Sequence, residues 1–130
     1  MTAGPLQRRV LHVEDDPGVQ ALVRATLAQH GGYEVDTASN GARAIELAVL
    51  RCPDLVLLDL DLPGMSGIEA LKSLRSRDAL RQVPVVFLTA SRDLLVDLEL
   101  LSLGAQVVHK PFRPADLLGT IERALGRKEV

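Results

Sequence analysis

One segment of the chain, Leu55-Val56-Leu57-Leu58-Asp59-Leu60-Asp61-Leu62-Pro63-Gly64, carries the strongest indication of its architecture. Four apolar residues, enough for a short buried strand, run directly into the carboxylate of Asp59. An ionised carboxylate at the end of a buried strand is costly unless other groups pair with it. We therefore expect Asp59 to meet charged or polar partners from other parts of the chain.

Short apolar runs recur on both sides of this segment. Four more candidate strands lie at residues 10–13, 33–37, 83–88 and 107–109, and segments with helical spacing of apolar residues separate them. Strands that are apolar on both faces and alternate with helices are typical of a parallel sheet covered on both sides. The sequence therefore predicts an α/β protein, a three-layer sandwich built from repeated pairs of a strand and a helix.

Residues at the ends of the predicted helices support this interpretation. Asp16 before Pro17 is typical of an N-cap followed by proline in the first turn, and Ser66 with Glu69 matches a capping box. Three helical segments are followed by a glycine that is expected to form a left-handed C-cap, namely Gly31, Gly104 and Gly126. The turn after the third strand is expected to take its shape from unusual backbone angles at Gly64 and Gly67.

Length and charge restrict the class of protein. The 130 residues fit one domain of ordinary size. The formal net charge is -2, the basic residues are scattered, and three residues are aromatic, so the basic patch and the stacking platform of a nucleic-acid-binding protein are missing. The chain has a single cysteine, Cys52, no secretory signal, and no apolar stretch near the ~18 residues of a membrane span. We expect a cytoplasmic protein that binds neither nucleic acid directly nor a membrane.

Polar residues follow four of the predicted strands, at the point where each strand ends. Glu14 and Asp15 follow the first strand, Asp59 the third, Thr89 the fourth and Lys110 the fifth. The carboxyl ends of parallel strands meet at one edge of the sheet, and the binding crevice of an open parallel sheet lies at that edge. The topology therefore predicts one site that contains all five residues.

The residue types in this site indicate phosphoryl chemistry. Three carboxylates in one place repel one another, and binding a cation relieves the repulsion. Oxygen ligands with room for water suit Mg²⁺. Lys110 and Thr89 add an ammonium and a hydroxyl, which together with a metal ion stabilise phosphoryl oxygens during in-line transfer. Asp59 is then the nucleophile, and it carries the phosphoryl group as an aspartyl phosphate.

Five short motifs make the resemblance to a known family specific. They are Val13-Glu14-Asp15-Asp16, Leu57-Leu58-Asp59-Leu60-Asp61-Leu62-Pro63-Gly64-Met65-Ser66-Gly67, Leu88-Thr89-Ala90, Gly104-Ala105 and Lys110-Pro111-Phe112. In this order the chain resembles the receiver domain of two-component response regulators, of the single-domain chemotaxis type, over residues 8–127, with flexible termini at 1–7 and 128–130. The resemblance implies a flavodoxin-like (βα)5 fold with strand order 2-1-3-4-5. It also implies a signalling module, stand-alone or excised from a longer protein, that catalyses its own phosphorylation and dephosphorylation and is not otherwise an enzyme.

The resemblance assigns the acidic residues to a phosphoacceptor and its metal site. Asp59 is the phosphoacceptor, and Asp15 binds Mg²⁺ directly. Glu14 acts mostly through water, and Asp61 offers its backbone carbonyl to the metal. Asp16 is left out of the metal set because its place before a proline favours a helix cap.

The remaining roles implied by the resemblance concern the phosphoryl group and its donor. Thr89 and Lys110 contact the phosphoryl oxygens, and the bond between Lys110 and Pro111 is cis. A histidine kinase or a phosphotransfer protein donates the phosphoryl group. The surface of the fourth helix, fifth strand and fifth helix then changes and engages an unidentified target or a second copy of the chain.

The chain departs from the family pattern in its switch region. The aromatic residue usually found three positions before the lysine is Val107 here, so the output signal must use displacement of Thr89 or movement of a strand. The fourth helix is rich in leucine, and the helical wheel predicts that the residues packed on the sheet are Leu94, Leu98 and Leu101. Unless neighbouring helices cover it, a partner or homodimer surface is then expected on the face of Val96, Leu100 and Leu103.

Two other functions remain open on the sequence alone. Asp59, Asp61, Thr89 and Lys110 are similar to the site of a haloacid-dehalogenase-like phosphatase with Asp61 as general acid, but the chain is short for that class and its second acidic pair precedes the lysine. Val107 is compatible with a pseudo-receiver that binds partners without phosphorylation, although all five site residues are retained.

Overall fold

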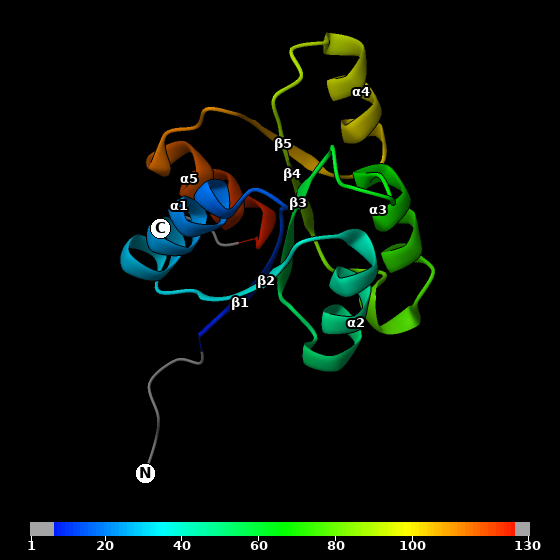
Figure 1. Ribbon diagram of the computed structural model, residues 1–130, viewed down its shortest axis with the longest axis horizontal. Helices are drawn as coiled ribbons and strands as arrows, with labels where there is room; N and C mark the ends of the chain where they lie inside the picture. The colour runs from blue at the N-terminus through cyan, green and yellow to red at the C-terminus, as the bar shows by residue number, and fades with distance from the viewer. Residues whose placement is uncertain (1–6, 127–130) are drawn as a thin grey trace.

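The computed structural model of the protein describes residues 7–126 and contains a five-stranded parallel sheet (Figure 1). The strands are β1 (Arg9–Val13), β2 (Glu34–Ala38), β3 (Leu55–Asp59), β4 (Val85–Thr89) and β5 (Gln106–His109). Their order in the sheet is β2-β1-β3-β4-β5, which confirms the predicted flavodoxin-like α/β fold. The termini expected to be flexible lie, apart from Gln7, outside the described residues, as does residue 127 at the predicted end of the domain.

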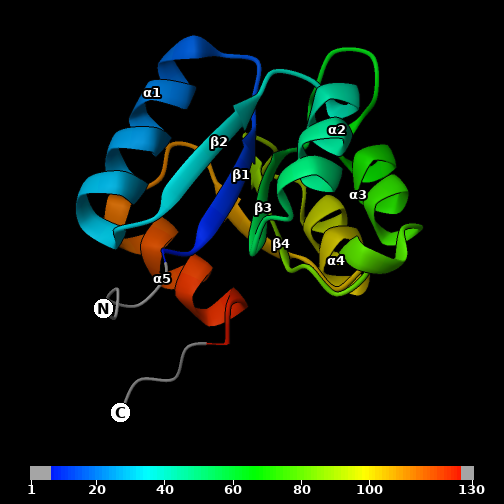
Figure 2. The ribbon, with the colours of Figure 1, turned by 90° about the horizontal axis from the view of Figure 1, so that it is seen from below.

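Within the described part of the chain, five α-helices connect and cover the strands. They are α1 (Pro17–Thr26), α2 (Gly41–Arg51), α3 (Gly67–Arg75), α4 (Leu94–Ser102) and α5 (Pro114–Ala124). A π-helical turn, η1 (Leu27–Gly31), extends α1, and a 3-10 turn, η2 (Asp78–Leu80), follows α3. Figure 2 shows α1 and α5 on one face of the sheet and α2, α3 and α4 on the other. No helix within residues 7–126 has both the length and the apolar character needed to cross a bilayer.

The two faces of the sheet carry separate apolar cores because side chains alternate along each strand. Leu57 of β3 packs with Leu117 and Ile121 under α1 and α5. Leu58, the next residue, packs with Phe87 on the side of α2, α3 and α4. All five residues of β3 are buried, so the strand that ends in Asp59 is the centre of the molecule.

Helix ends follow the predicted capping chemistry with one exception. The side chain of Asp16 accepts hydrogen bonds from the backbone at the start of α1, and Ser66 and Glu69 form the complete capping box of α3. Gly104 and Gly126 have the predicted positive φ, but after α1 the left-handed residue is Gly32 and not Gly31. The helix continues through one π turn before it ends, which moves the C-cap one residue along.

The prediction for the faces of α4 is wrong. The residues expected to pack on the sheet, Leu94, Leu98 and Leu101, are 68%, 52% and 49% exposed. Leu100 is fully buried, and Val96 and Leu103 pack partly against the core. Because leucine occurs all around this helix, the hydrophobic pattern did not define its inner face. An apolar stripe is nevertheless exposed on α4, on the side that also carries Leu95.

Candidate functional site

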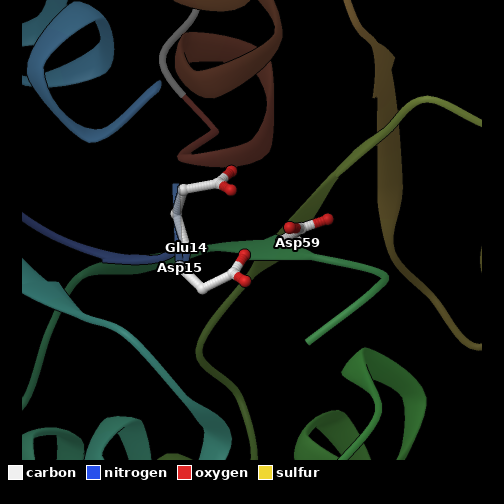
Figure 3. Close-up of side chains that lie close together, drawn as sticks. All are labelled: Glu14, Asp15 and Asp59. Atoms are coloured by element: carbon white, nitrogen blue, oxygen red, sulfur yellow. The ribbon is translucent and has the colours of Figure 1, made fainter. Parts of the chain in front are cut away.

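Three carboxylates meet at the carboxyl ends of β1 and β3 (Figure 3). Glu14 and Asp15 directly follow the last residue of β1, and Asp59 is the last residue of β3. One carboxylate oxygen from each lies within 4.8 Å of the others. Glu14 and Asp59 are buried, whereas Asp15 is exposed. The structure thus brings the predicted acidic residues together. The cluster is open to solvent on the side of Asp15.

Lys110 reaches this cluster from the end of β5. Its Nζ donates a hydrogen bond of 2.9 Å to Oε1 of Glu14 and lies 3.5 Å from Oδ2 of Asp59. Burial alone would lower the pKa of Lys110, but the hydrogen bond to Glu14 and the charge of Asp59 outweigh it and raise the pKa. The ammonium therefore stays protonated and compensates part of the negative charge in the site.

The charge of Asp59 remains incompletely compensated. Burial, followed by the negative charge of Glu14, raises the pKa of Asp59 to about 6, against the opposing effect of Lys110. The backbone N–H of Asp61 donates a 3.2 Å hydrogen bond to Oδ1 of Asp59, which also favours the ionised form. A buried carboxylate whose ionisation is disfavoured gains from any bound cation.

Thr89 ends β4 directly beside the strand that carries Asp59. It is fully buried, and its Oγ1 accepts a 2.9 Å hydrogen bond from the backbone N–H of Ser91. Because β3 and β4 pair in parallel, Asp59 is in register with Leu88, and Thr89 lies one residue further along. The hydroxyl is thus held at the same edge of the sheet, as the sequence predicts.

Asp16 and Asp61 have different places in the site. Asp16 is exposed and caps α1, in agreement with its assignment as a helix cap, while its backbone N–H lies 3.3 Å from Oε2 of Glu14. Asp61 is exposed as well, and its backbone N–H donates a hydrogen bond to Oδ1 of Asp59. The structure thus shows how the backbone of Asp61 supports the carboxylate of Asp59.

Gly67 is required for close packing rather than for an unusual backbone angle. A Cβ at this position would lie 2.5 Å from the carbonyl oxygen of Asp59 and 2.9 Å from Cα of Leu60. The first turn of α3 therefore packs directly on the end of β3. Gly64, in contrast, has a φ of +77°, so the expectation of a left-handed residue in this turn is correct for Gly64 alone.

Two contacts around the site were not predicted from the sequence. His12 is fully buried with Nε2 4.0 Å from Oε1 of Glu14, and burial together with the charge of Lys110 lowers the pKa of His12 to about 3. Nε2 of His109, next to Lys110, lies 2.8 Å from Oδ2 of Asp97 on α4. Neither contact has a sequence signal, since each histidine belongs to an ordinary strand segment and its partner depends on the tertiary structure.

The donor set of the site fits Mg²⁺. Its ligand atoms are carboxylate oxygens within 4.8 Å of one another, and the exposed Asp15 leaves room for water. Burial, followed by the charge of Glu14, raises the pKa of Asp59, and a bound cation would favour its ionised form. The chain can therefore hold a divalent cation next to a carboxylate and an ammonium, which is the arrangement that stabilises a phosphoryl group. The bond between Lys110 and Pro111 is cis, as the resemblance implies.

Comparison with known proteins agrees with this site. Residues 10–122 match the family model of the response regulator receiver domain. The chain belongs to this family. As a receiver it is a signalling module of two-component phosphorelays and not an enzyme in the usual sense.

Individual relatives extend the comparison. The receiver is 37% identical over 125 residues to the DNA-binding response regulator MtrA of Mycolicibacterium smegmatis, covering 95% of this chain and 53% of MtrA. It superimposes on the chemotaxis protein CheY4 of Vibrio cholerae with a TM-score of 0.84 and 32% identity, covering 92% of this chain and 99% of that one. The receiver domain of the sensor histidine kinase PA1611 of Pseudomonas aeruginosa matches with a TM-score of 0.83 and 32% identity over 93% of this chain and 99% of that one. That structure holds a magnesium ion in its active site cleft.

The receiver spans about half the length of several curated relatives that it matches. The regions of those relatives beyond the receiver have no counterpart in the residues compared. What those relatives bind is therefore a property of the relatives and is not transferred to this chain.

Proposed function

We propose that the protein is a phosphoacceptor switch, in which Asp59 receives a phosphoryl group from a histidine kinase or a phosphotransfer protein in the cytoplasm. The observation that supports this most directly is the convergence of Asp59 with Glu14, Asp15 and Lys110 at one edge of the sheet. These residues come from three separate strand ends. Packing alone gives no reason to gather three carboxylates there, because two of them are buried at a cost.

The transfer requires the ionised carboxylate of Asp59. One of its Oδ atoms attacks the phosphorus of a phosphohistidine, the P–N bond breaks, and the imidazole nitrogen keeps the bonding electrons and takes up a proton. Lys110 is placed to bind a phosphoryl oxygen, since its Nζ lies 3.5 Å from Oδ2 of Asp59. The hydroxyl of Thr89 binds a second phosphoryl oxygen by turning away from the N–H of Ser91.

Mg²⁺, when bound, neutralises charge that builds up on the phosphoryl oxygens. Asp15 is the direct carboxylate ligand in this proposal because it is exposed and faces the cluster. Glu14 acts through water, since its Oε1 already accepts the hydrogen bond of Lys110. Asp59 itself and the backbone carbonyl of Asp61 complete the set.

The donor has an apolar surface on which to dock beside the site. A hollow of about 380 Å³ lies between α1 and the ends of β4 and β5. Its lining residues are Val19, Leu22, Ala90, Lys110, Pro111 and Phe112. Leu22 is 50% exposed, so a partner covering it would gain apolar burial next to the attacking carboxylate.

The output surface in this proposal is the α4-β5-α5 face, which binds a downstream protein or a second copy of the chain. Four leucines of α4 are about half exposed or more, namely Leu94, Leu95, Leu98 and Leu101. An exposed apolar stripe of this kind supports a protein partner. The helix also lies at the β5 side of the sheet (Figure 1), so a change at the ends of β4 and β5 reaches it.

The test is phosphorylation of the purified protein by acetyl phosphate with Mg²⁺. We expect a hydroxylamine-labile mass increase of one phosphoryl group that requires Mg²⁺ and is abolished by Asp59→Asn. Asp15→Asn slows the reaction strongly, whereas the matched control Asp16→Asn keeps its helix cap and reacts like the wild type. If wild type gains no phosphoryl group while folded, the chain is a pseudo-receiver, and catalytic release of phosphate from small phosphate esters would identify a phosphatase instead.

A further inference from the structure

Thr89 and His109 lie side by side at the ends of neighbouring strands. The two residues are paired in register between β4 and β5. In-register residues of a parallel pair point to the same face of the sheet. Phe87, two residues before Thr89, packs in the core beneath α2, α3 and α4, so Thr89 and His109 both face the side of α4. The threonine proposed to bind the phosphoryl group thus has a histidine as its lateral neighbour.

His109 connects this strand end to α4. Its Nε2 lies 2.8 Å from Oδ2 of Asp97, and the two side chains are 33% and 17% exposed. Leu100, one turn further, is fully buried beneath the same helix. The second half of α4 is therefore fixed by a partly buried polar contact and by apolar packing.

The first turn of α4 is held in a different way. Leu94 and Leu95 are 68% and 75% exposed, so burial contributes little to its position. Instead, a chain of hydrogen bonds leads to it from Thr89. The N–H of Ser91 donates to Oγ1 of Thr89 at 2.9 Å, and the N–H of Asp93 donates to Oγ of Ser91 at 3.2 Å. Asp93 in turn caps the helix by accepting from the N–H of Leu95 at 2.9 Å.

Val107 cannot form either link. It lies two residues before His109 on the same face of β5 and packs partly against the core. Its side chain has no polar atom and is too short to reach the end of the strand. The connection between the phosphoryl site and α4 therefore does not run through Val107.

In the proposed function, Thr89 passes the signal to the first turn of α4 through Ser91 and Asp93. We infer that the contact between His109 and Asp97 is the fixed point that confines the change to this turn. The inference rests on the proposed function. When the hydroxyl of Thr89 turns to a phosphoryl oxygen, the N–H of Ser91 loses its acceptor and the chain of hydrogen bonds opens at its first link. The exposed leucines Leu94 and Leu95 then rearrange, while the helix from Asp97 onward keeps its place.

The experiment is residue-resolved amide hydrogen exchange with and without beryllofluoride and Mg²⁺, with adduct occupancy measured independently from the ¹⁹F resonance of bound fluoride. In wild type the adduct raises exchange at residues 95–97 by at least about fivefold and at residues 99–102 by less than about twofold, since opening of the first turn is local. Ser91→Ala raises exchange at residues 95–97 already in the free protein, because the second link of the chain is missing.

Asp97→Ala and His109→Leu test the fixed point. In both variants the rise caused by the adduct extends to residues 99–102, whereas the matched control Glu99→Ala keeps the wild-type pattern. A merely structural contact would change exchange equally with and without the adduct and leave the difference as it is in wild type, which overturns the inference. Absence of the adduct from folded wild type overturns the proposed function itself, a result that the ¹⁹F signal separates from the other outcomes.

Discussion

The ammonium nitrogen of Lys110 donates a 2.9 Å hydrogen bond to Oε1 of Glu14, a residue 96 positions earlier in the chain. The two residues belong to the ends of β5 and β1, with β3 and β4 between these strands in the sheet. Lys110 therefore reaches across Asp59, from which it is 3.5 Å away. A single ammonium thus compensates two buried carboxylates, which leaves an excess of negative charge at the site.

Replacing Lys110 by Met removes the charge but keeps much of the length of the side chain. The carboxylate of Glu14 is 1% exposed and would lose its charged partner, so we expect the free energy of unfolding without Mg²⁺ to fall by about 3 kcal/mol. Urea unfolding in EDTA measures the change. The matched variant Lys72→Met, at an exposed lysine of α3, should stay within about 0.5 kcal/mol of wild type. Equal effects of the two substitutions would contradict the role of Lys110 as the compensating charge.

Asp59→Asn should stabilise the metal-free protein, and increasingly so as the pH rises. The folded pKa of Asp59 is about 6, above its ordinary value of 3.8. Between these two values the unfolded chain has lost a proton that the folded protein keeps, so wild type loses stability as the pH rises from about 4 to 6. Asparagine does not titrate, and the gain of the variant should grow across this window to the order of 2 kcal/mol.

Urea unfolding at several pH values in EDTA tests this prediction. Asp78→Asn, at a side chain that is 92% exposed, is the control and should differ from wild type by a constant amount. Saturating Mg²⁺ should reduce the advantage of Asp59→Asn, because the ion supplies the positive charge that the site lacks. An advantage that stays flat with pH would show that Asp59 ionises at its ordinary pKa.

Much of the fold and site followed from the sequence for a local reason. The apolar runs mark strands that are buried on both faces, and the first polar residue after each run marks the edge where parallel strands end. Asp59 and Thr89 proved to be the last residues of β3 and β4, and Lys110 follows β5 directly. Helix caps such as Ser66 with Glu69 were equally readable, because their partners lie within four residues.

The features that the sequence did not indicate depend on contacts between distant elements. Either Leu98 or Leu100 of α4 could face the protein core, because a helix that is apolar all round has no preferred inner face. The packing of α4 on the sheet decides between them. The contact between His109 and Asp97 requires that same docking. Gly67 was expected for its backbone angles, but the close approach of α3 to the carbonyl oxygen of Asp59 explains it instead.

The orientation of α4 leads to a direct test by truncation. Leu100 is fully buried, so Leu100→Ala should cost about 2 to 5 kcal/mol in the free energy of unfolding. Leu98 is 52% exposed, and Leu98→Ala should change it by no more than about 0.5 kcal/mol. Both variants carry the same chemical change on the same helix, so thermal or urea unfolding compares them directly. The reverse ranking would restore the helical-wheel prediction and place Leu98 against the sheet.

Mg²⁺ should stabilise the protein through Asp15. A ligand that binds the folded state alone stabilises it in proportion to the logarithm of its concentration over the dissociation constant, about 2.7 kcal/mol at a hundredfold excess. We therefore expect the melting temperature to rise steadily with MgCl₂ in wild type, and to rise much less in Asp15→Asn, which lacks the exposed carboxylate of the cluster. Asp16→Asn keeps a capping side chain at the start of α1 and should respond as wild type does. KCl at matched ionic strength is the control that separates binding at the site from screening of surface charge. Equal titration curves for the two variants would place the bound cation outside the cluster of Glu14, Asp15 and Asp59.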